Sequence, residues 1–129
     1  MSDTGHNGSG NDELRQAMAL HRAGRVAEAD LHYAAVLRAE PAQPQALRLQ
    51  GILARDLGEL DRSLRLLRKA VDAAPLDPEP AAELGLSYLA AGYLHLAEAA
   101  FRQALTRDPE SGKALANLGA LLQHRGHVQ

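Results

Sequence analysis

The chain has 129 residues, of which 46% are hydrophobic and 23% are charged, and its formal net charge is −2 at pH 7. This composition is typical of a protein that buries a core, and a pI near 6.3 argues against a nucleic-acid-binding surface, which normally needs a strongly basic face. The absence of cysteine excludes disulfides, thiol catalysis and cysteine-based zinc sites, and is consistent with a reducing compartment.

The first ten residues, MSDTGHNGSG, are rich in glycine, serine and asparagine. They contain neither the basic region nor the apolar region of a secretory signal. No apolar run in the chain approaches the roughly 20 residues that are needed to cross a bilayer. We therefore expect a flexible tail over residues 1–10 and one elongated domain over 11–129, in a cytoplasmic protein without a membrane span.

Glycine and proline recur every 34 residues along the rest of the chain. Three series have this period: Gly24, Gly58, Gly92 and Gly126; Gly51, Gly85 and Gly119; Pro41, Pro75 and Pro109. A fixed period of this length indicates one supersecondary unit that is copied several times. The copies cover about residues 10–43, 44–77 and 78–111, with a partial fourth over 112–129.

Each copy has the apolar pattern of two amphipathic helices. In the second copy, apolar residues recur at intervals of three and four, first from Leu49 to Leu57 and then from Leu60 to Val71. Gly58 lies between the two stretches, where a left-handed residue can end the first helix and form a hairpin corner. Pro75 follows the second helix and ends it, because proline lacks the amide hydrogen that the helix needs.

Gly51 and Gly85 are predicted to lie in the middle of a helix. Glycine costs about 1 kcal/mol relative to alanine at such a position. A close approach of the partner helix, at Ser63 or Ala97, would explain why glycine stands there. The chain is thus predicted to be a run of antiparallel helical hairpins.

The third copy carries a pattern of small and large residues in a fixed order, namely Leu84, Gly85, Tyr88, Gly92, Ala97, Phe101, Ala104 and Pro109. This order and spacing closely resemble the tetratricopeptide repeat (TPR). The resemblance implies an all-α, right-handed α-solenoid of antiparallel helix hairpins, with three TPR units plus one extra helix. The second copy departs from the pattern at Gln50 and Ala54, which predicts a looser contact there.

The TPR resemblance also implies where a ligand would bind. In that family the first helix of each pair lines the concave face. Carried onto this chain, the candidate groove residues are Met18, His21, Arg22, Arg48, Ile52, Arg55, Leu86, Leu89 and Lys113. We expect a protein–protein interaction module that holds a peptide or protein segment, with a carboxylate near Arg48 and Arg55 and an apolar anchor near Ile52, Leu86 and Leu89. The alternative is that these leucines pack against neighbouring helices and the arginines only solubilise an idle face.

Two ligand codes of the family are poorly matched. The places of the clamp that holds EEVD chaperone tails are occupied by Leu14, Met18, Leu49, Glu79 and Glu83, so we expect no such tail as a partner. The asparagine ladder of O-linked N-acetylglucosamine transferases would retain only Asn117.

No catalytic, cofactor or metal motif stands out. His124 and His127 have a spacing that could hold a metal on one helix, but no carboxylate lies nearby in the sequence. The acidic residues cluster in the predicted first turns of helices, where they complement the helix dipole. We therefore expect no enzyme activity of the chain itself, no cofactor and no metal.

The partial fourth copy predicts one helix from Lys113 to about Arg125, with Gly126 as a further corner. It leaves Leu115, Leu118 and Leu122 without a second helix to cover them, so they are candidates for self-association. A piece of a longer solenoid is the favoured explanation, and a homo-oligomer is the other. Bacterial TPR arrays are found fused to glycosyltransferases, sulfotransferases and hydroxylases, so a segment that recruits substrates or partners for a larger enzyme is the main rival function. A self-assembling scaffold is the third.

Overall fold

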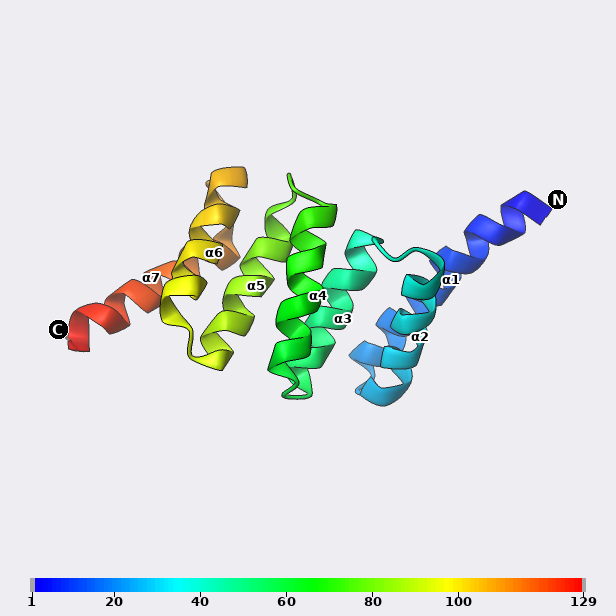
Figure 1. Ribbon diagram of the computed structural model, residues 1–129, viewed down its shortest axis with the longest axis horizontal. Helices are drawn as coiled ribbons and strands as arrows, with labels where there is room; N and C mark the ends of the chain where they lie inside the picture. Colours follow the sequence, from blue (N-terminus) through cyan, green and yellow to red (C-terminus); the bar gives the residue numbers. More distant parts are fainter. Residues whose placement is uncertain (1, 129) are drawn as a thin grey trace.

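The computed structural model describes residues 2–128, and in this range it contains seven α-helices and no strand. The helices are α1 (Ser2–Arg22), α2 (Val26–Ala39), α3 (Pro44–Asp56), α4 (Leu60–Ala73), α5 (Pro78–Ala91), α6 (Leu94–Arg107) and α7 (Gly112–Val128). Figure 1 shows them as a row of antiparallel hairpins, α1–α2, α3–α4 and α5–α6, with α7 at the end. The predicted all-α solenoid of three helix pairs and one extra helix is confirmed.

The hairpin corners lie at glycines with a left-handed backbone. Gly24, Gly58 and Gly92 have φ angles of 81°, 79° and 85°, a region that favours glycine because it has no Cβ. The fourth predicted corner is wrong, because α7 continues through Gly126 to Val128. At the other three corners a following helix packs back on the first.

The helix ends follow the local signals of the sequence. Proline occupies the first turn of both α3 and α5, where its missing amide hydrogen costs no helical bond. Helices α3 and α5 also have side-chain caps at their first turns. Gln43 Oε1 accepts a hydrogen bond from Ala46 N at 2.7 Å, and Asp77 Oδ1 accepts one from Glu79 N at 3.0 Å. The helices before Pro75 and Pro109 end two residues ahead of each proline, as expected.

Helix α1 begins at Ser2, so the backbone is helical over residues 2–10, where the sequence predicted a flexible tail. This stretch continues the helix of residues 11–22 without a break. Figure 1 shows it projecting beyond the hairpins. Its flexibility in solution stays a prediction.

The core runs along the solenoid instead of gathering at one centre, as expected for a repeat protein. One cluster of buried side chains joins α1, α2 and α3 around Tyr33 and Leu53, and a second joins α4 to α7 around Leu67 and Phe101. The chain is therefore held together by contacts between neighbouring pairs.

The mid-helix glycines are sites of close approach. A Cβ added at Gly51 would lie 2.7 Å from Leu67 Cγ, and one at Gly85 would lie 2.5 Å from Phe101 Cε1. The approach was predicted, but the residue above each glycine is the large Leu67 or Phe101, not the small Ser63 or Ala97. Ser63 contributes in another way, because its hydroxyl bonds the Gly51 carbonyl oxygen at 2.8 Å.

The first and second pairs are joined by a polar contact. Gln50, which is buried, donates to Asp30 Oδ1 at 2.8 Å, and Arg62 donates to both oxygens of Asp30 at 2.7 and 3.0 Å. Burial would raise the pKa of Asp30, but these hydrogen bonds outweigh it and lower the pKa. The predicted loose contact at Gln50 is therefore a bonded one.

Candidate peptide-binding groove

The first helix of each pair forms the inner layer of the solenoid. Contacts join α1 to α3, α3 to α5, and α5 to α7. Among the described residues, no contacts join α2 to α4 or α4 to α6. In a curved solenoid the layer whose helices lie closer together is on the inside, so α1, α3, α5 and α7 form the inner layer. In Figure 1 the helices α2 and α4 lie in front of α1 and α3. The candidate residues lie on helices of the inner layer, as the TPR resemblance implied.

At the end of α1, His21 contacts both α2 and α3. His21 Nδ1 lies 3.2 Å from the Tyr33 hydroxyl, and its Nε2 lies 3.1 Å from Asp56 Oδ2. Burial raises the pKa of Tyr33 to about 12, and the charges of Arg22 and Arg48 act in the opposite direction. Among the described residues neither arginine forms an ion pair, and the acidic group of Asp56 contacts His21.

The other predicted groove cations are paired within the chain, at Glu83 of α5. Arg55 donates to Glu83 Oε1 at 2.7 Å, to the Glu83 carbonyl at 3.0 Å and to Ser87 Oγ at 3.1 Å. Lys113 donates to Glu83 Oε2, and to Glu79 Oε2 at 3.0 Å. The Glu83 side chain is only 5% exposed. Arg55 and Lys113 therefore neutralise a buried carboxylate, which leaves less of their charge for a ligand.

The pKa values of this cluster follow its contacts. Burial by itself would raise the pKa of Glu83, but the hydrogen bonds from Lys113 and Arg55 lower it overall. Burial would lower the pKa of Lys113, and its bonds to Glu83 and Glu79 raise it overall. Glu83 was not predicted to be a structural centre. The available signal was that Glu83 is the one charged residue between Glu79 and the end of α5.

The apolar candidates are half-buried. Met18 packs against the cluster around Tyr33, while Leu86 and Leu89 pack against the cluster around Phe101. Ile52 lies one turn after Arg48 on α3 and is also half-buried. The alternative in which Leu86 and Leu89 pack against neighbouring helices thus holds in part, but some of their surface remains open.

A shallow depression of about 260 Å³ lies at the start of α3. It is lined by Gln43, Pro44, Gln45, Arg48 and Asp77. Arg48 and Asp77 give its walls opposite charges.

The three leucines of α7 have different environments. Leu115 and Leu122 are 50% and 41% exposed, but Leu118 is only 7% exposed and belongs to the cluster around Phe101. The prediction that Leu118 is free for self-association is wrong, because this residue faces the third pair. It is the residue with which α7 covers that pair.

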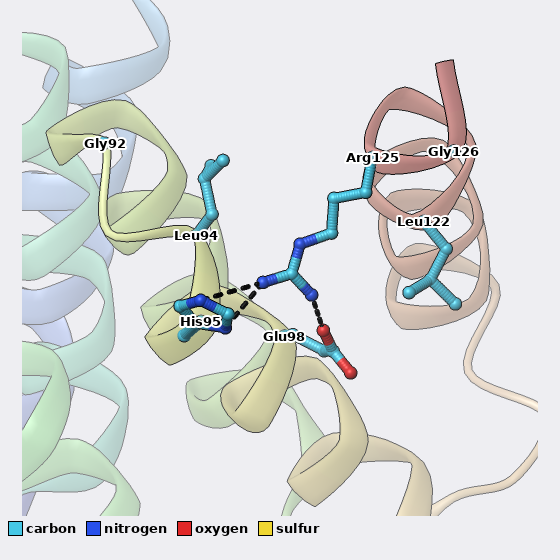
Figure 2. A pocket seen from close by; sticks show the side chains of 7 residues that line it. All are labelled: Gly92, Leu94, His95, Glu98, Leu122, Arg125 and Gly126. Carbon is cyan, nitrogen blue, oxygen red and sulfur yellow. Dashed lines mark hydrogen bonds and ion pairs between the residues drawn. The ribbon is translucent and has the colours of Figure 1, made fainter. Parts of the chain in front are cut away.

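A larger pocket of about 810 Å³ lies between the start of α6 and the end of α7. Figure 2 shows that Arg125 reaches from α7 towards α6, where it donates to Glu98 and to a ring nitrogen of His95 at 2.6 Å. Hydrogen bonds from Arg102 and the nearby charge of Arg125 lower the pKa of Glu98. These contacts tie the end of α7 to the third pair.

Among the residues that the structure describes, no three His, Cys, Asp or Glu side chains stand close enough to hold a metal ion. The side chain of His127, one of the two histidines with metal-like spacing, lies outside the described part. No helix in that part is long and apolar enough to cross a membrane.

These features define a helical-repeat protein whose inner layer forms a groove. The family model of the tetratricopeptide repeat matches residues 14–78 and 83–129, so the chain belongs to the TPR family. Domains of this family generally serve as protein–protein interaction modules.

Relatives with this fold differ widely in length. The chain is 35% identical to bovine (Bos taurus) BBSome complex member BBS4 over 69 residues, which are 54% of this chain and 13% of BBS4. It superposes on the Thermobaculum terrenum O-GlcNAc transferase mutant K341M with a TM-score of 0.85 and 26% identity, covering 90% of this chain and 22% of the transferase. The Sgt2 TPR domain of Aspergillus fumigatus has a TM-score of 0.87 at 15% identity, with 93% of this chain and 81% of that one covered. The chain thus spans less than a quarter of the first two proteins.

Proposed function

We propose that the concave face of this TPR domain binds an extended peptide or protein segment that carries an acidic group, and that the acidic group lies at Arg22 and Arg48. The observation that carries the proposal is that Arg22 and Arg48 form no ion pair among the described residues, whereas Arg55 and Lys113 do. The rest of the groove has its cations engaged with Glu83. Hydrogen bonds to charged groups contribute about 1.5–3 kcal/mol, so these two arginines are the natural anchors for a carboxylate.

An apolar side chain of the same segment would rest on Ile52 and on the open parts of Leu86 and Leu89. Ile52 is one turn from Arg48 on α3, so a peptide residue next to the acidic one can reach it. In this proposal the chain binds and does not catalyse, acts in the cytoplasm, and has no EEVD tail as its partner, because Glu79 and Glu83 occupy clamp positions.

A displayed library of random peptides, selected on the 129-residue chain, tests this function. The selected peptides should be enriched in aspartate or glutamate beside a large apolar residue. Arg22→Glu with Arg48→Glu should weaken the best peptide by at least about tenfold, as measured by fluorescence anisotropy. The matched control is Arg38→Glu with Arg65→Glu, which makes the same charge change at exposed sites on α2 and α4. Equal losses in both pairs, or selected peptides without acidic residues, would contradict the proposal.

A second candidate function is a segment that recruits substrates or partners for a larger enzyme. It is favoured by the 26% identity with an O-GlcNAc transferase, 22% of which is covered by this chain. The intact mass of the endogenous polypeptide, detected with an antibody to this segment, tests it. A mass well above 13.8 kDa with a catalytic sequence attached supports this function, and a mass of 13.8 kDa excludes it.

A further inference from the structure

The shallow depression at the start of α3 holds two opposite charges that are not paired with each other. Its volume is about 260 Å³, and it is lined by Arg48 of α3 and by Asp77, the residue before α5. Among the described residues, neither of these side chains forms an ion pair. Each charge is therefore open to an opposite charge that a ligand brings.

Asp77 is the carboxylate that remains open at this place. Its Oδ1 atom accepts from Glu79 N at 3.0 Å, which orients the side chain, and no described group bonds its Oδ2 atom. Glu79, two residues further on, is already bonded to Lys113 through its Oε2 atom at 3.0 Å. A cation that enters the depression is thus attracted to Asp77 more than to Glu79.

The remaining walls of the depression are polar or rigid. Gln43 Oε1 accepts from Ala46 N at 2.7 Å, so this side chain is held against the first turn of α3. Gln45 adds a second amide, and Pro44 supplies an apolar ring. An apolar ligand side chain placed here would cover the two charges without replacing their contacts with water. The depression is therefore suited to a charged or dipolar group.

Arg48 belongs both to this depression and to the proposed anchor of the acidic ligand group. On the basis of that proposed function, we infer that the ligand segment carries a lysine or arginine two residues from its acidic residue. The acidic side chain bonds Arg48, and the basic side chain enters the depression and bonds Asp77. Asp77 is then a residue that determines specificity.

The spacing of two residues follows from the geometry of an extended segment. Side chains two residues apart point to the same side, about 7 Å from each other. The volume of about 260 Å³ is several times the roughly 30 Å³ that a water molecule occupies in the liquid, so the end of a basic side chain fits.

Asp77 also acts against another class of ligand. A second acidic side chain at the same place would lie against its carboxylate, and like charges brought together at an interface oppose binding. The chain is therefore expected to prefer one acidic residue near a base over a run of acidic residues. Arg22 and Arg48 by themselves would not make this distinction.

A peptide library with one fixed glutamate and three random residues on each side tests the selectivity. Peptides selected on the 129-residue chain should be enriched in lysine or arginine two positions from the glutamate and depleted of further acidic residues. The same library selected on Asp77→Asn should lose both preferences. Asparagine caps a helix about as well as aspartate does, so this variant should keep the start of α5 and the same thermal midpoint.

Three synthetic peptides measure the size of the effect by fluorescence anisotropy. They differ only at the position two residues from the glutamate, on the side that the selection prefers, where they carry lysine, glutamine or glutamate. The lysine peptide should bind about three- to fivefold more tightly than the glutamine peptide, as for a partly exposed ion pair. The glutamate peptide should bind most weakly, and Asp77→Asn should remove both differences.

Asp108→Asn is the matched control for the lost charge. Asp108 Oδ1 accepts from Glu110 N at 3.1 Å, as Asp77 does from Glu79 N, but Asp108 does not line the depression. This variant should keep the order of the three peptides. Equal binding of all three by the unaltered chain, or differences that persist in Asp77→Asn, would refute the inference. A similar gain for all three peptides in Asp77→Asn would refute it too, because Asp77 would then only compete with the ligand for Arg48.

Failure of the proposed function gives a different result. Binding of the lysine peptide would then be unchanged by Arg22→Glu with Arg48→Glu, and both the function and this inference would be wrong. If that pair of substitutions abolishes binding but the lysine has no effect, the acidic-peptide groove stands and the inference alone is refuted.

Discussion

Phe101 of α6 packs directly over Gly85 of α5, with its Cε1 atom 2.5 Å from the place where a Cβ would stand. No residue larger than glycine fits below this ring unless the ring moves, and the ring is fully buried. The same relationship joins Leu67 to Gly51. The distance between the two helices of a pair is therefore set by a glycine on the first helix and a large side chain on the second.

Gly85→Ala should destabilise the protein. Overpacking of a dense core costs about 1–3 kcal/mol, and against a buried ring we expect this cost to exceed the roughly 1 kcal/mol that alanine gains in helix propensity. Urea unfolding should show a lower midpoint with an unchanged slope. The control is Gly119→Ala, where the site is open and the same propensity should raise the midpoint at low protein concentration. A stabilised Gly85→Ala would show that α6 can shift freely.

Glu83→Gln should reduce the free energy of unfolding at neutral pH and make that free energy depend less on pH in the acidic range. The folded-state pKa of Glu83 is lowered from the ordinary value of 4.5, so the carboxylate contributes stability above that value. This contribution is lost as the pH falls below 4.5 through the lowered pKa. At neutral pH we expect a loss of about 1–3 kcal/mol, because Arg55 and Lys113 keep their charges without the carboxylate.

The measurement for Glu83 is urea unfolding at neutral pH and again at a pH below its folded pKa. The gap between the unaltered protein and the variant should shrink at the acidic pH. Glu110→Gln, at an exposed site, is the control and should change neither curve. A gap of constant size would mean that the stability does not depend on the charge of Glu83.

Leu118→Ala and Leu115→Ala should have different effects although both are in α7. Leu118 is buried in the cluster around Phe101, so its truncation should cost about 2–5 kcal/mol. Leu115 is half exposed, and its truncation should change the free energy of unfolding by less than about 0.5 kcal/mol in the monomer. Thermal unfolding in dilute solution distinguishes them. Similar losses at both positions would contradict the packing of α7 on the third pair.

Tyr33 should ionise only in strong alkali. Its folded pKa is about 12 against an ordinary value of 10.0, chiefly because of burial. A group whose folded pKa is raised contributes stability that is complete below pH 10.0 and is lost as the pH rises through about 12. Ultraviolet titration of a variant with Tyr88→Phe and Tyr93→Phe should show this late transition, since it leaves only Tyr33. Ionisation near pH 10 in the folded protein would show that water reaches the phenol.

The sequence was sufficient to predict the features that depend on neighbours along the chain. The helix pairs, the corners at Gly58 and Gly92, and the ends before Pro75 and Pro109 were all predicted, because each depends on a propensity within a few residues. The corner predicted at Gly126 was wrong, because this glycine lies within helix α7. The TPR pattern placed the candidate groove residues on the inner helices for the same reason, since its period is local and strict.

The repeat period, read from the sequence by itself, determined that the chain is a solenoid of helical hairpins, and the TPR resemblance implied which helices line its inner face. Only the tertiary structure decided which groove cations remain unpaired. Arg55 and Lys113 reach Glu83 across 28 and 30 residues of chain, and Leu118 meets the cluster around Phe101. These contacts depend on how one pair stacks on the next. That stacking is set by the shape and size of buried side chains, which no periodic pattern encodes.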